Sequence, residues 1–136
     1  MTPAERLAGR TPDSADIEAI ARHTLERLPS PFAESLGDIV LLVEPVADAE
    51  TARSVGLRHP MDLSGLYQGI PLNERSVEHS GTLPERITLY SRPILEEWRS
   101  TRVSLERLVS HILIHEVGHH FGFSDDDMHA LEDEAE

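Results

Sequence analysis

Apolar residues recur every three or four positions near the start of the chain, and this spacing predicts a helix. The helix follows Asp13 or Ser14, either of which can cap it, and it ends before Pro29 and Pro31. Its apolar face contains Ile17, Ile20, Ala21, Thr24, Leu25 and Leu28.

The last third of the chain is also helical in pattern. We expect a helix over residues 93–100 and a long helix over residues 103–121, which Gly122 ends because glycine adopts the left-handed conformation without strain. Ser124 can cap a short last helix over residues 124–131.

Between these helices the pattern indicates strands. Residues 39–43 are continuously apolar, which predicts a central strand covered on both faces, and residues 47–53 can form a short helix after it. Residues 65–71 predict a strand at a sheet edge, because Pro71 cannot donate to a ladder. Residues 87–90 predict another strand. The expected fold class is α+β, with a small sheet packed on a long helix.

The length of 136 residues suits one domain, which we place at residues 13–132, between a flexible arm at 1–12 and an acidic tail at 133–136. A net charge of −13 disfavours nucleic acid as a partner. No apolar run is long enough to span a membrane, and residues 1–20 lack the apolar core of a signal peptide. We therefore expect a cytoplasmic location, and the oligomeric state stays open.

The absence of cysteine leaves histidine and carboxylates as metal ligands. His115 and His119 lie four residues apart in the predicted long helix, about 40° apart around its axis, so both imidazoles can reach one zinc ion. Glu116 lies beside them and can take a proton from a zinc-activated water. Flanking residues such as Leu113 and Ile114 indicate that this helix is mostly buried, which argues against a solvated surface helix.

Two other histidines need a different explanation. His111 and His119 are about 12 Å apart along a helix, too far for both to bind one ion. We prefer His115 with His119, because Ile112 cannot act as a base in the alternative pair of His111 with His115. His111 is then expected to be packed or to support the site, and His120 points to another face with a structural role.

A third ligand must come from beyond the helix. Gly122 allows the chain to double back, and Asp125 then follows six residues after His119. Asp125 could equally lie in the first turn of a helix capped by Ser124, and the two roles are compatible. His129 and Glu132 remain competitors for the third ligand.

The motif and two other segments are similar to one family. Residues 115–125 resemble the pattern H-E-x-x-H-x-x-G-x-x-D of small bacterial zincin-like proteins, the minimal matrix-metalloprotease-like metallopeptidases. Residues 65–72 resemble the G-L-Y-x-G-x-P segment of that family, and residues 83–90 resemble its L-P-x-R-I strand. The resemblance implies a zincin-like α+β fold, His115, His119 and Asp125 as ligands of one zinc ion, and Glu116 as catalytic base.

These observations favour a zinc metallopeptidase that hydrolyses peptide bonds of a peptide or protein substrate. Tyr67 is a candidate donor to the transition state or substrate, although an edge-strand tyrosine that only packs is the commoner case. The alternative function is a zinc-containing peptide- or protein-binding module that cleaves nothing in isolation. Glu116 speaks against that alternative, because a structural zinc needs no base beside it.

Overall fold

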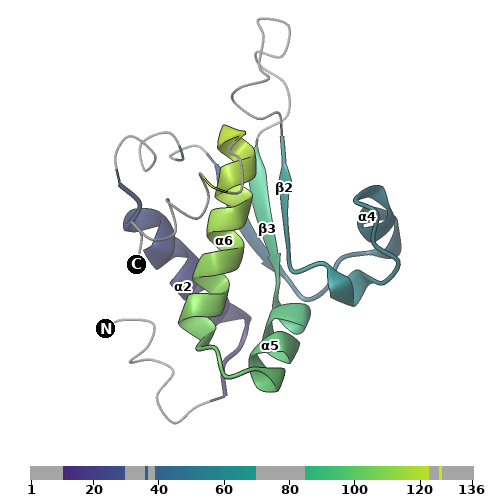
Figure 1. Cartoon of the computed structure of the whole chain (residues 1–136), viewed down its shortest axis with the longest axis horizontal. Helices are drawn as coiled ribbons and strands as arrows, with labels where there is room; N and C mark the ends of the chain where they lie inside the picture. The colour runs from purple at the N-terminus through teal and green to yellow at the C-terminus, as the bar shows by residue number, and fades with distance from the viewer. Residues whose placement is uncertain (1–10, 30–35, 37–38, 70–84, 123–125, 127–136) are drawn as a thin grey trace, which may run out of the picture.

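The described part of the chain contains both helices and short strands (Figure 1). The computed structural model describes residues 11–29, 36, 39–69, 85–122 and 126. In chain order its elements are α2 (Ser14–Glu26), β1 (Val40–Glu44), α4 (Ala49–Ser54), the 3₁₀ helix η1 (Pro60–Asp62), β2 (Gly65–Gln68), β3 (Arg86–Tyr90), α5 (Ser91–Ser100) and α6 (Leu105–Phe121). The predicted α+β class is confirmed.

The three described strands form one sheet in the order β1-β3-β2. β1 runs parallel to β3, with Val40 opposite Arg86, and β2 runs antiparallel to β3, with Gly65 opposite Leu89. Among the described strands β2 lies at an edge, as predicted. Its predicted continuation to residue 71 lies outside the described residues.

The prediction that residues 39–43 form the central strand is wrong, because β3 occupies that place among the described strands. Ile87 and Leu89 of β3 are fully buried, whereas Val40 at the start of β1 is 40% exposed. The apolar run in β1 has another cause. Leu41 belongs to the core, and α2 packs against β1, so this edge strand buries apolar side chains as a central one would.

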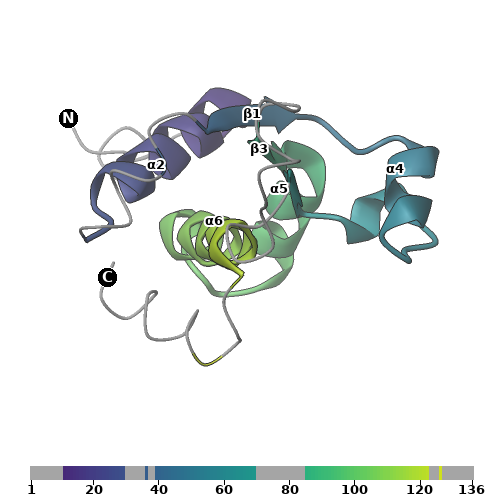
Figure 2. The same cartoon turned by 90° about the horizontal axis from the view of Figure 1, so that it is seen from above.

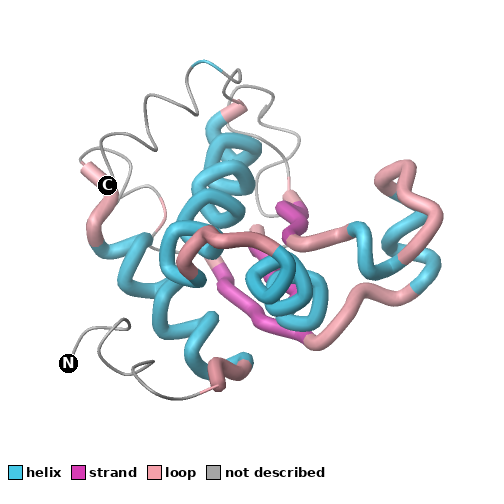
Figure 3. Tube along the Cα trace, turned by 60° about the horizontal axis from the view of Figure 1, so that its bottom comes forward, coloured by secondary structure: helices cyan, strands magenta, loops and turns pink. Residues whose placement is uncertain are grey.

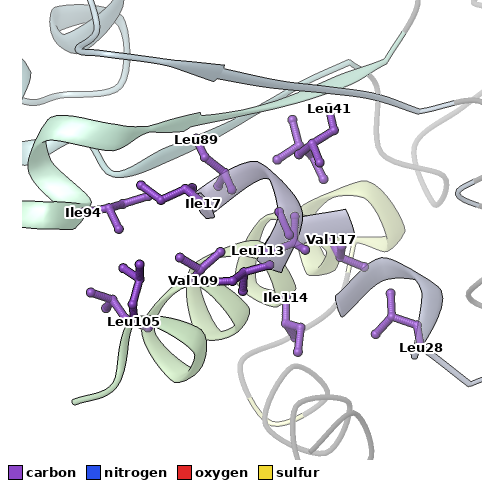
Figure 4. Close-up of a cluster of buried hydrophobic side chains, with 14 of the residues drawn as sticks. Ile17, Leu28, Leu41, Leu89, Ile94, Leu105, Val109, Leu113, Ile114 and Val117 are labelled. Carbon is purple, nitrogen blue, oxygen red and sulfur yellow. The ribbon is translucent and has the colours of Figure 1, made fainter. Parts of the chain in front are cut away.

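Helix α6 is the element around which the core is built. It contacts α2, α5, β2 and β3, and Figures 2 and 3 show it lying alongside α2 with the strands next to both. Its buried side chains interdigitate with those of α2 and the sheet (Figure 4). The core residues labelled there are Ile17, Leu28, Leu41, Leu89, Ile94, Leu105, Val109, Leu113, Ile114 and Val117. This packing fixes the position of α6 against the sheet.

The helix ends follow from local chemistry. Asp13 caps α2 in a capping box with Asp16, which selects Asp13 from the two predicted caps. Ser104 caps α6 by accepting a hydrogen bond from the amide of Arg107, and Gly122 ends it with φ 73°, as predicted. The predicted last helix lies outside the described residues apart from Asp126, which is helical.

The described helices include none that is both long and apolar enough to cross a membrane.

α4 and η1 stand away from α2 and α6, beyond one end of the sheet (Figures 1 and 2).

Candidate active site

The two histidines predicted as metal ligands lie side by side on the second half of α6. The ring centroids of His115 and His119 are 4.8 Å apart, and the ring planes are inclined at 64°. Both residues are exposed. His111, one turn earlier, is also exposed, so the expectation that it is packed is wrong, whereas the alternative that it supports the site stays a prediction.

The sequence argument that α6 is mostly buried holds only for part of its surface. Leu113, Ile114 and Val117 are buried against α2 and the sheet, whereas the histidine stripe faces outward. Because both histidines are exposed, burial in the core gives no reason for their spacing of four residues. An accessible histidine pair is, however, what an ion or substrate arriving from solvent requires.

Within residues 11–29, 36, 39–69, 85–122 and 126, no three His, Asp or Glu side chains gather as a possible metal site. The candidates for a third ligand, Asp125, His129 and Glu132, all lie outside the described residues.

Glu116, the predicted base, differs sharply from its neighbours because it is buried, with only 9% of its side chain exposed. Its Oε1 accepts a hydrogen bond from the backbone N–H of Tyr67 at 3.0 Å, and His119 Nδ1 lies 3.2 Å from the same oxygen. The carboxyl group thus lies between the edge strand β2 and the exposed histidine pair.

This environment changes the acidity of Glu116. Burial raises the pKa of the Glu116 carboxyl above 4.5, its ordinary value, while the charge of His115 and the hydrogen bond from Tyr67 act in the opposite direction. A carboxyl group whose pKa is raised accepts and returns protons more readily near neutral pH. The arrangement is therefore suited to proton transfer beside the histidine pair.

Gly65 allows β2 to approach α6 closely enough for this contact. A Cβ atom at Gly65 would lie 2.9 Å from Ile112 Cγ2 and 3.4 Å from Glu116 Cγ. A side chain here would therefore push the strand away from the base. Sequence reasoning treated Gly65 only as part of a strand, since a glycine in a strand does not reveal which element approaches it.

Tyr67 contributes its backbone N–H to the site. The hydroxyl oxygen is buried, and a Cβ at Gly69 would lie 2.8 Å from it. The Tyr67 ring packs edge-on against His120, with centroids 5.9 Å apart. The predicted contact of the Tyr67 side chain with the transition state or substrate stays a prediction. The Tyr67 backbone N–H, which sequence reasoning missed, reaches Glu116.

His120 faces away from the exposed stripe, as predicted. It is 4% exposed, and its Nδ1 contacts Glu85 Oε2. Glu85 directly precedes β3, and its backbone carbonyl accepts a hydrogen bond from the Val40 amide. His120 therefore links the end of α6 to the start of the central strand.

The chain matches the model of a known protein family. The model of a family described as zincin-like metallopeptidase matches residues 36–135, a span that contains the whole sheet, α6 and the site around Glu116. The small sheet packed on a long helix is consistent with a zincin-like fold. A search of curated proteins found no match to the chain.

The raised pKa of Glu116 predicts a pH dependence of stability in protein stripped of metal by a chelator. A carboxyl with a higher pKa in the folded state binds more protons folded than unfolded between the two pKa values. The contribution of Glu116 to wild-type stability should therefore fall as pH rises from below 4.5 through the higher folded value. The side chain at position 116 does not titrate in Glu116→Gln. The unfolding free energy of this variant minus that of the wild type should therefore rise with pH between the unfolded and folded pKa values of Glu116 and then level off.

Urea unfolding at a series of pH values measures this difference. Glu97→Gln, at an exposed position of α5, controls for the loss of one carboxylate. A Glu116→Gln difference that stays constant with pH would contradict the raised pKa.

Proposed function

The chain belongs to the zincin-like metallopeptidase family, and on that premise we propose that it hydrolyses peptide bonds using one zinc ion held by His115 and His119. Two exposed imidazoles one helical turn apart suit this role, since zinc accepts imidazole and carboxylate ligands and the chain has no cysteine. His119 Nδ1 faces the Glu116 carboxyl, which leaves Nε2 as the metal ligand. When bound, zinc supplies a Lewis acid that acidifies water and polarises a carbonyl group.

The buried Glu116 beside this pair is the observation that carries the proposal. Its carboxylate takes a proton from the attacking water, whose oxygen forms a bond to the scissile carbonyl carbon. The same carboxyl then gives that proton to the amine nitrogen as the carbon–nitrogen bond breaks. The Tyr67 N–H holds Oε1 throughout, which leaves Oε2 as the oxygen that exchanges the proton.

Asp125 completes the proposed ligand set. It follows the Gly122 turn, and carboxylate oxygen is a suitable zinc ligand. His129 and Glu132 are the alternatives. Peptides or proteins are the substrates that a metallopeptidase family implies.

The alternative is a zinc-containing module that binds a peptide or protein without cleaving it. Binding without cleavage does not require a carboxyl group held in a buried position next to the metal ligands. The burial of Glu116 therefore favours the enzyme.

The first prediction from the proposed function concerns the metal. The purified chain should hold about one zinc ion, removable by chelators and by acid because bound imidazoles must be deprotonated. His115→Ala and His119→Ala should each lose stoichiometric zinc, measured by elemental analysis, while His111→Ala keeps it. Retention of zinc in His115→Ala together with its loss in His111→Ala would show that the site is misplaced.

The second prediction separates enzyme from binding module. Glu116→Gln keeps the side-chain shape and an acceptor for the Tyr67 amide but removes the base. Peptide hydrolysis should fall by about 10²–10⁴-fold, measured with a peptide library, while zinc content stays unchanged. Glu106→Gln, on the same helix, is the matched control. Equal rates in Glu116→Gln and wild type would rule out Glu116 as the base.

The third prediction concerns the third ligand. Asp125→Ala should weaken zinc affinity by about tenfold or more, measured by competition with a chelator of known affinity. Asp126→Ala and Asp127→Ala remove a neighbouring carboxylate each and should have little effect. If Asp125→Ala binds zinc as wild type does while His129→Ala or Glu132→Gln does not, the assignment must move to that residue.

A further inference from the structure

A second group of residues lies beside the base, three of them with polar or aromatic side chains and one of them a glycine. It consists of Tyr67, Gly69, Glu85 and His120, which come from β2, the residue after β2, the residue before β3, and α6. The C-terminal end of α6 lies beside the end of β2 and the start of β3 (Figure 1). We call these four residues the strand-end cluster.

The contact between His120 and Glu85 anchors the cluster. The His120 side chain is 5% exposed and that of Glu85 is 16% exposed, and His120 Nδ1 contacts Glu85 Oε2. Buried polar pairs add little net stability compared with apolar packing, but they can specify one arrangement of the elements they join. Here the joined elements are α6 and the start of β3.

Tyr67 is held by the other members of the cluster. Its ring lies edge-on to His120, and a Cβ atom at Gly69 would be 2.8 Å from its hydroxyl oxygen and 2.7 Å from Glu85 Cγ. The absence of a side chain at Gly69 thus makes the space that the tyrosine hydroxyl and the Glu85 side chain occupy. The tyrosine ring is fixed between the helix and the strand ends.

Tyr67 is also the residue whose backbone N–H binds Glu116 Oε1. β2 has only four residues and pairs with β3 alone among the described strands, so the ladder holds it on one side. Because ring and amide belong to one residue, fixing the ring against His120 also fixes the distance between the amide and the carboxylate.

We propose that Glu85 and His120 are positioning residues that act through Tyr67. They hold β2 against α6, so that the Tyr67 amide keeps the Glu116 carboxylate in place. The catalytic part of this inference rests on the proposed role of Glu116 as base. The structural part does not depend on that role, and it is tested separately by exchange of the Tyr67 amide.

The first experiment follows amide hydrogen exchange by NMR in the metal-free protein. His120→Ala should speed exchange of the Tyr67 amide by about tenfold or more, while the Ile87 and Leu89 amides of β3 keep wild-type rates. His120→Asn places an amide nitrogen near the position of Nδ1 and should restore protection to within about threefold of wild type. His111→Ala, an exposed histidine of the same helix, should leave the Tyr67 amide unchanged.

Two results would overturn the proposal. One is unchanged exchange of Tyr67 in His120→Ala. The other is equal acceleration of the Tyr67, Ile87 and Leu89 amides, since that would mean His120 supports the whole fold and positions nothing in particular.

A second pair of variants tests the cluster without altering His120, in case its removal prevents folding. Gly69→Ala introduces a Cβ into the space of Tyr67 and Glu85, and it should speed Tyr67 exchange as His120→Ala does. Gly56→Ala is the control, because Gly56 also has a positive φ, 82°, but no atom lies within 4 Å of the added Cβ. Equal Tyr67 exchange in the two variants would contradict the proposal.

The catalytic consequence is read from steady-state kinetics. His120→Ala and Gly69→Ala should lower kcat by about 10–10²-fold, with KM within about twofold and zinc content unchanged, and His120→Asn should recover most of kcat. A rise in KM with constant kcat would contradict a positioning role. If the wild type hydrolyses no peptide, the proposed function fails, and the exchange measurements still decide the positioning claim.

Discussion

The hydrogen bond from the Tyr67 N–H to Glu116 Oε1 joins the edge of the sheet to the helix that carries the histidine pair. The rest of the site depends on it. Gly65 allows the strand to come close enough, the core behind α6 holds the helix, and the contact between His120 and Glu85 ties the strand ends to the same helix. A carboxyl group with freedom to turn toward solvent would have neither the burial nor the orientation seen here.

The site combines two opposite requirements on one helical turn. His115 and His119 are exposed, which suits their proposed role as metal ligands, whereas Glu116 between them in sequence is buried. Burial of a carboxylate is costly, and here the charge of His115 and one backbone amide offset part of that cost. The pKa of Glu116 is raised because the compensation is incomplete, which is a property that a proton-transferring group can use.

Local features of the site could be predicted from the sequence, and long-range ones could not. The spacing of His115 and His119 and the glycine that ends α6 are local patterns, so the helix and the side-by-side placement of the two histidines were predicted correctly, whereas their role as metal ligands stays a prediction. The place of β1 at the sheet edge was missed, because an edge strand packed against α2 has the same apolar sequence as a central strand. The Tyr67 amide, Gly65 and the partnership of His120 with Glu85 depend on contacts between distant segments, and a backbone N–H carries no residue-specific signal at all.

The central claim is that Glu116, held by the edge strand, is the base beside a zinc ion bound by His115 and His119. A crystal structure of the zinc-loaded protein tests it most directly. The account predicts a metal coordinated by the His115 and His119 side chains, with the Glu116 carboxylate outside the coordination sphere and still bonded to the Tyr67 amide. A metal bound between His111 and His115, or one that takes Glu116 as a ligand, would contradict it.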